Sequence, residues 1–139
     1  MSTKLQVPGQ ALTVDALAMS AALGGETSDK KTSAWTALGY VRHFAVLAQV
    51  TNVAEDQVVT MVVSTASDSS GTGSAELTPA SESKALTYTG TATATDIGVL
   101  CAECRFIPVG HTHVQVAVST DDTDGAEVLS VMLLRKLSD

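Results

Sequence analysis

The chain has 139 residues and a formal net charge of −7, and 45% of its residues are apolar while only 4% are aromatic. This length suits one domain with a single hydrophobic core, preceded by a short arm. The eight lysines and arginines are scattered, so we expect no nucleic-acid partner, because phosphate neutralisation needs clustered basic residues. No stretch reaches the roughly 20 apolar residues of a membrane-spanning helix, and we expect no membrane association.

The first 33 residues are interpreted as an N-terminal arm and linker. The pattern of residues 12–23 fits a helical face and an alternating strand equally well, whereas residues 24–33 are polar and begin with glycine, which favours a linker. Pro8 favours an extended path, and we expect Leu5, Val7 and Pro8 to contact a neighbouring subunit. The chain lacks a secretory signal pattern and a disulfide framework, so we expect cytoplasmic synthesis.

Residues 34–139 are predicted to form one all-β domain, an antiparallel β-sandwich of jelly-roll-like type. Apolar alternation and turn signals predict strands at the ranges 40–50, 57–64, 97–107, 113–120 and 127–134. We expect the first two to pair through their short connection. The Asp-rich stretch 121–127 departs from a calcium-loop register, and we interpret it as a hairpin turn. Residues 80–95 are small and polar, which indicates an edge strand or surface excursion around Tyr88, a second candidate contact region.

Between Tyr40 and Leu77, two predicted strands are followed by a polar turn. Asp68 is expected to bond the turn through its carboxylate, while Gly71 and Gly73 supply positive φ. The residues that carry a family resemblance are Ala66, Ser67, Asp68, Gly71, Gly73 and Leu77, joined more loosely by the last strand, 128–135. In these residues the chain resembles the small head structural proteins of tailed bacteriophages, the capsid decoration or cement proteins.

The resemblance implies a structural virion protein on the capsid exterior. Such a protein binds the major capsid protein after shell expansion, often as a homotrimer at local three-fold positions, and stabilises the mature head without catalysis or a cofactor. Two alternatives stay open. One is a phage tail or head–tail connector component. The other is a β-sandwich carbohydrate-binding or adhesion module, which would need exposed aromatic platforms such as Trp35 or Tyr88.

Cys101, Cys104, His111 and His113 are of the residue types that bind zinc. On a regular strand, however, Cys101 and Cys104 point to opposite faces, and no glycine or proline lies between them to form a tight knuckle. We therefore interpret the cysteines as strand residues, at least one of them buried, and expect no metal. His111 and His113 lie opposite Val114 in strand parity, so we expect them to face solvent or a partner. No motif of an enzyme nucleophile occurs, and we expect no enzymatic activity.

Overall fold

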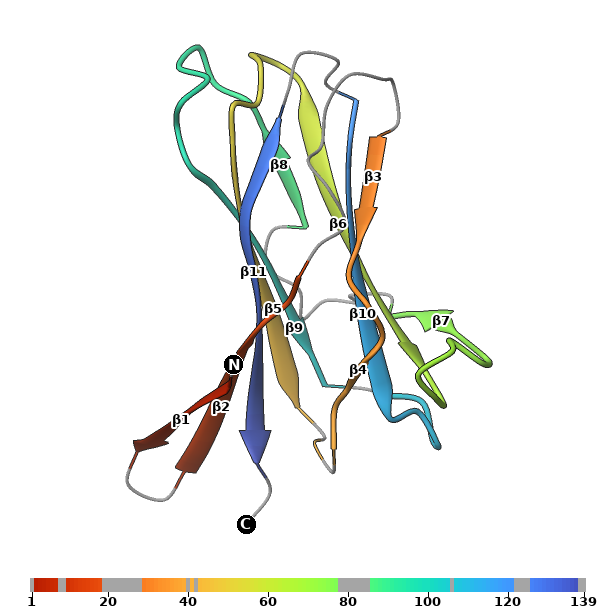
Figure 1. The fold of residues 1–139 in the computed structure, drawn as a ribbon. Helices are drawn as coiled ribbons and strands as arrows, with labels where there is room; N and C mark the ends of the chain where they lie inside the picture. The colour runs from red at the N-terminus through yellow and green to blue at the C-terminus, as the bar shows by residue number, and fades with distance from the viewer. Residues whose placement is uncertain are drawn as a thin grey trace.

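The computed structural model describes residues 2–7, 10–18, 29–39, 41, 43–77, 86–105, 107–121 and 126–137. Over these ranges the chain is an antiparallel β-sandwich, which confirms the predicted fold class (Figure 1). The same ranges contain no helix that is long and apolar enough to cross a membrane.

In the described residues, eleven strands form two sheets. The five-stranded sheet has the order β1 (Ser2–Val7), β2 (Gln10–Ala16), β11 (Glu127–Leu137), β5 (Phe44–Thr51), β9 (Gly98–Cys104). The six-stranded sheet comprises β3 (Asp29–Thr32), β4 (Thr36–Ala37), β10 (His113–Thr120), β6 (Val58–Ala66), β7 (Ala75–Glu76), β8 (Thr87–Thr89). Here β3 and β4 pair with β10, and β7 and β8 pair with the opposite edge of β6.

The core lies between the sheets and is built from aliphatic side chains at alternate strand positions. In β5 every second residue is buried, and β10 follows the same pattern with Val114, Val116 and Val118 fully buried. Because strand side chains alternate between faces, this period places one apolar face of each sheet against the other. The predicted strand ranges therefore correspond closely to β5, β6, β9, β10 and β11, and β10 has the predicted bounds.

The predicted hairpin between the first two strands is wrong, because β5 and β6 lie in different sheets. Their connection arches across one end of the sandwich, with Asn52 and Asp56 at positive φ and Val53 buried in the core. The stretch after β10 was likewise predicted to be a hairpin turn, yet β10 and β11 belong to opposite sheets. In both cases each strand has an apolar face to bury. The two strands bury these faces equally well when they lie in opposite sheets and face each other across the core.

The first 33 residues contribute strands to both sheets. β1 and β2 form a hairpin at the edge of the five-stranded sheet, where β2 pairs with β11 (Figure 1). β3 pairs with β10 in the other sheet, and the buried Ser33 hydroxyl accepts a hydrogen bond from the Val116 amide at 2.9 Å. Residues 29–33 are therefore part of the sandwich rather than of a linker, because their backbone groups complete its sheet.

Candidate functional site

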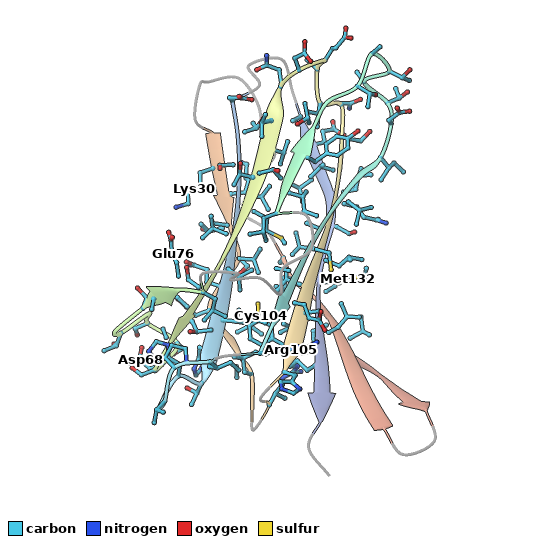
Figure 2. The ribbon with its side chains drawn as sticks, turned by 180° about the vertical axis from the view of Figure 1, so that it is seen from behind. Lys30, Asp68, Glu76, Cys104, Arg105 and Met132 are labelled. Atoms are coloured by element: carbon cyan, nitrogen blue, oxygen red, sulfur yellow. The ribbon has the colours of Figure 1, made fainter. Side chains whose placement is uncertain are left out.

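The two cysteines lie on opposite faces of β9, as predicted. Cys101 is half-buried on the outer side of the five-stranded sheet, whereas Cys104 is buried between the sheets, where Figure 2 shows it. Burial raises the pKa of the Cys104 thiol to about 12, with smaller contributions from Cys101 and Glu103. A thiol in this state is a poor nucleophile and a poor metal ligand, since both roles require the thiolate.

The two histidines are held by threonine hydroxyls. Nδ1 of His111 lies 2.8 Å from Oγ1 of the buried Thr65, and Nδ1 of His113 lies 2.8 Å from Oγ1 of Thr112. The Thr112 hydroxyl donates its only hydrogen to the Ser67 carbonyl oxygen at 2.8 Å. His113 must then donate from Nδ1, which fixes its tautomer when the ring is neutral. The loop that precedes β10 is thus tied to β6 by His111 and to Ser67 by Thr112.

The structure does not bring the four zinc-type residues together. Cys104 is in the core, Cys101 is outside the five-stranded sheet, and the histidines lie at the start of β10. Within the described part of the chain, no three histidine, cysteine or acidic side chains form a group that could hold a metal ion. Residues 122–125 of the Asp-rich stretch lie outside the described residues.

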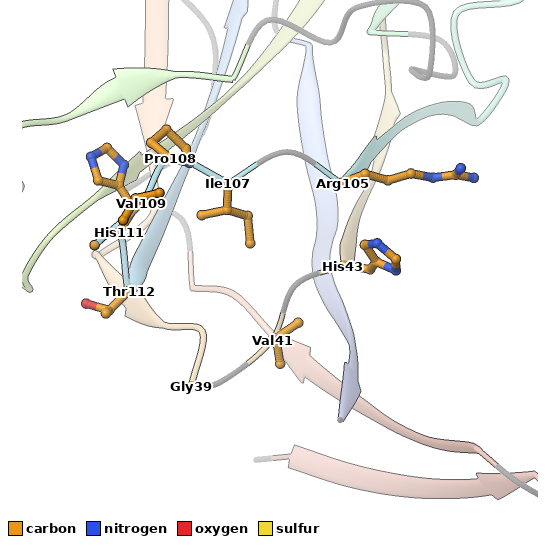
Figure 3. Close-up of a pocket in the computed structure, with 10 residues that line it drawn as sticks. Gly39, Val41, His43, Arg105, Ile107, Pro108, Val109, His111 and Thr112 are labelled. Carbon is orange, nitrogen blue, oxygen red and sulfur yellow. The ribbon is translucent and has the colours of Figure 1, made fainter. Parts of the chain in front are cut away.

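A hollow of about 560 Å³ opens where the chain enters β5 and leaves β9 (Figure 3). Val41 and Ile107 form apolar walls, while His43, Arg105 and His111 lie around it. His43 and Arg105 are neighbours because the adjacent residues Phe44 and Cys104 are paired across β5 and β9. This hollow can receive an apolar side chain and place a carboxylate beside a cation, which is the chemistry of a protein contact.

The turn after β6 has the predicted chemistry. Oδ1 of Asp68 accepts hydrogen bonds from the amides of Ser70 (2.9 Å) and Thr72 (3.1 Å), and Gly71 and Gly73 have φ of 82° and 63°. Hydrogen bonds from the Thr72 side chain and backbone, then from the Ser70 backbone, lower the pKa of Asp68 from 3.8. The Asp68 carboxylate is thus bonded to the backbone of its own turn.

Two aromatic rings that could have formed sugar platforms cover glycines instead. The Trp35 ring lies over Gly71, where an added Cβ would come within 2.6 Å of its Nε1. The Tyr88 ring lies over Gly98, where an added Cβ would lie 2.4–2.5 Å from three ring atoms. The Tyr88 ring therefore has backbone over one face, and the Trp35 ring has backbone beside its Nε1. Neither contact could be predicted from the sequence, because no local signal links Trp35 with Gly71 or Tyr88 with Gly98.

The predicted contact residues are spread over the molecule. Leu5 and Val7 lie in the edge strand β1, and Pro8 lies outside the described residues. Tyr88 lies in β8 at the opposite sheet, packed against the core, while His111 and His113 are at the end where the 105–112 loop enters β10. The structure therefore does not bring the five described residues of this set together on one surface.

No protein-family model matches the chain, and no curated protein matches it. Among solved structures, the chain is similar to the N-terminal endo-1,4-β-D-xylanase 10B of Clostridium thermocellum, a structure of its CBM22-1 and GH10 modules complexed with xylohexaose. The TM-score is 0.55 and the identity 15%, over 94% of this chain and 22% of that chain. The chain thus spans about a fifth of that protein, and the likeness establishes the β-sandwich fold alone.

Proposed function

We propose that the chain is a non-catalytic capsid decoration protein, which binds the outer surface of a tailed phage's major capsid protein shell and stabilises the mature head. In the turn that resembles the small head proteins, Asp68, Gly71 and Gly73 each have a structural role. The histidines and Cys104, which were candidates for chemistry, are engaged in hydrogen bonds or buried in the core. A protein that binds a partner and catalyses no reaction fits the positions of these side chains best.

The observation that carries the proposal is the β1–β2 hairpin. Among the strands that the structure describes, β1 pairs with β2 alone and forms one edge of the five-stranded sheet. Figure 1 shows the hairpin diverging from the rest of the sandwich beside the C-terminal end of β11. An edge strand can extend its sheet into a second chain through backbone hydrogen bonds. On a shell lattice, many such modest contacts would add avidity.

Co-sedimentation tests this function. Purified protein is mixed with expanded and with unexpanded shells of the phage major capsid protein, and bound protein is measured after centrifugation. We expect binding to expanded shells, and a strong loss of binding when residues 2–9 are deleted. Protein that stays in the supernatant with both kinds of shell would contradict the proposal. A large ring in light scattering would instead favour a tail or connector component.

Carbohydrate binding is the second candidate, favoured by the fold shared with the xylanase structure that contains a CBM22-1 module. The aromatic geometry opposes it, since Trp35 and Tyr88 each lie against a glycine, and Trp35 is in the connection between β3 and β4 whereas Tyr88 is in β8. Titration calorimetry with xylohexaose distinguishes the two functions. We expect no heat of binding, and saturable binding at one site would replace capsid decoration with a carbohydrate-binding function.

A further inference from the structure

Exposed apolar side chains gather on the outer side of the five-stranded sheet. Among the described residues, four large apolar side chains are exposed: Ile97 (59%), Val99 (45%), Leu129 (49%) and Val109, which lies in the loop before β10. Gly98 is buried, so Ile97 and Val99 on either side of it point away from the core. An exposed apolar group of this kind marks a surface that binds a partner.

Strand pairing and a β-bulge bring Leu129 to the same outer face. Val99 on β9 pairs with Gln49 on β5, and Gln49 pairs with Ser130 on β11. The register of β11 shifts between Val128 and Ser130, so Leu129 is the extra residue of a bulge. Val128 packs against the core, and alternation therefore directs Leu129 outward. Val99 and Leu129 thus lie on the two sides of Gln49.

The outer face stays apolar towards the middle of the sheet. Leu47 pairs with Met132 on β11 and with Cys101 on β9, and all three side chains are half-buried. Every strand that the structure describes belongs to one of the two sheets, and the second sheet covers the inner side only. Figure 2 shows Met132 on the five-stranded sheet and Glu76 on the other. Because an antiparallel sheet that meets water usually carries polar residues on that side, this face has the composition of a contact surface.

Carboxylates border the exposed apolar residues at one end of this face. Glu127 pairs with Thr51, and the Thr51 hydroxyl donates a hydrogen bond to the Asp96 carbonyl oxygen at 3.3 Å. Glu55 and Asp56 follow in the connection that leaves β5, and all four acidic residues are exposed. The connection from β5 to β6, the loop between β8 and β9 and the first four residues of β11 contain neither lysine nor arginine. This border of the outer face is therefore negatively charged.

We propose that the outer face binds a protein surface on which apolar residues are bordered by lysines or arginines. Burial of Val99, Leu129 and their neighbours supplies the attraction, because these side chains leave water on binding. The carboxylates of Asp96 and Glu127 select a basic partner, since the charges across an interface are complementary. The same carboxylates repel the phosphates of nucleic acids and of anionic membranes.

Under the proposed function, on which this assignment rests, the basic partner is the shell of the major capsid protein. The outer face and the β1–β2 hairpin belong to the same sheet, and two modest contacts with one shell add avidity. A second copy of the chain does not offer the required cations. The described arginines in and next to this sheet are already paired, Arg105 with Glu103 and Arg135 with Asp15.

Co-sedimentation with expanded shells of the major capsid protein tests the apolar part of the surface. Val99→Gln and Leu129→Gln remove apolar contacts without changing the charge, and each should raise the dissociation constant about tenfold or more. The matched control is Val109→Gln, which changes an exposed valine in the loop before β10 and should bind like wild type. Circular dichroism shows whether each variant is folded, and Ile97→Gln replaces a variant that is not.

Charge reversal tests the acidic border. Glu127→Lys should weaken binding to the shells about tenfold at low salt and less at high salt, because salt screens exposed charges. The matched control is Glu76→Lys on β7 of the other sheet, where the residue is also exposed. It changes the net charge of the chain by the same amount and should leave binding unchanged. Equal weakening by the two variants would overturn the role of the border.

The outcomes separate this surface from the proposed function. If wild type binds the shells and Val99→Gln and Leu129→Gln bind equally well, the outer face is not the contact, while the proposed function stands. If wild type binds no shells, the proposed function is contradicted, and titration calorimetry with a synthetic peptide whose leucines are flanked by lysines tests the face alone. We expect weaker binding of this peptide to Val99→Gln than to Val109→Gln, and equal binding would overturn the surface.

Discussion

The Arg135 guanidinium forms an ion pair with the Asp15 carboxylate and links β11 to the N-terminal strand β2. It also donates a hydrogen bond to the Ala37 carbonyl oxygen, 2.9 Å away in β4 of the other sheet. Both charged side chains are largely buried, each 17% exposed. Arg135 therefore connects the N-terminal hairpin and the two sheets to one another.

Replacing Asp15 should destabilise the whole sandwich. Asp15→Ala leaves the Arg135 charge without its carboxylate in a largely buried position, and we expect a loss of about 1–3 kcal/mol in the free energy of unfolding. The matched control is Glu103→Ala, which removes an exposed partner of Arg105. It should change the free energy by less than about 0.5 kcal/mol. Urea unfolding followed by circular dichroism measures both, and equal effects would contradict the role given to Arg135.

Gly71 should be less tolerant of alanine than Gly73, although both have positive φ in the same turn. A Cβ at Gly71 would collide with the Trp35 ring, whereas at Gly73 it would meet nothing within 4 Å. Gly73→Ala should cost about 1 kcal/mol from backbone conformation alone, and Gly71→Ala about 2–4 kcal/mol. Tryptophan fluorescence provides a second measurement, because Trp35 must move in Gly71→Ala only. Similar costs and unchanged fluorescence would exclude the contact.

Cys104 should resist alkylation in the folded protein. With its pKa raised to about 12 by burial, roughly one thiol in ten thousand is ionised at pH 8. In a Cys101→Ser variant, iodoacetamide at pH 8 should leave the native chain unmodified and add one group in denaturant, as mass spectrometry can show. The protonated Cys104 thiol also contributes to the free energy of unfolding, because the folded state binds its proton more tightly than the unfolded state. This contribution is present below about pH 9 and is lost as the pH rises towards 12.

Asp68 should contribute to stability in the opposite pH range. Hydrogen bonds from Thr72 and Ser70 lower its pKa from 3.8, so its contribution is present above that value and is lost as the pH falls through the folded-state pKa. Wild type should therefore exceed Asp68→Ala in melting temperature at pH 6, with the difference shrinking at acidic pH. A Thr72→Val variant should raise the pKa of Asp68 in an NMR titration. A constant melting difference down to pH 2 would contradict this account.

Strand alternation explains why much of the sandwich could be predicted. Residues 113–120 alternate between valine-rich and polar positions, and β10 has those bounds with its valines in the core. The opposite orientation of Cys101 and Cys104 follows from the same period, as does the outward position of His113. The Asp68–Gly73 turn was also predictable, because its hydrogen bonds and positive φ values are local properties of those residue types.

The sequence by itself thus determined the five long strands β5, β6, β9, β10 and β11, the opposite orientations of Cys101 and Cys104, and the turn that reverses the chain after β6. The tertiary structure alone decided that β5 and β6 lie in opposite sheets, that β3 completes the edge of β10, and that Asp15 meets Arg135. The reason is physical. Alternation specifies an apolar face but not the strand that supplies its backbone partner. The contact of Trp35 with Gly71 likewise joins residues that become neighbours only when β3, β4, β10 and β6 assemble into one sheet.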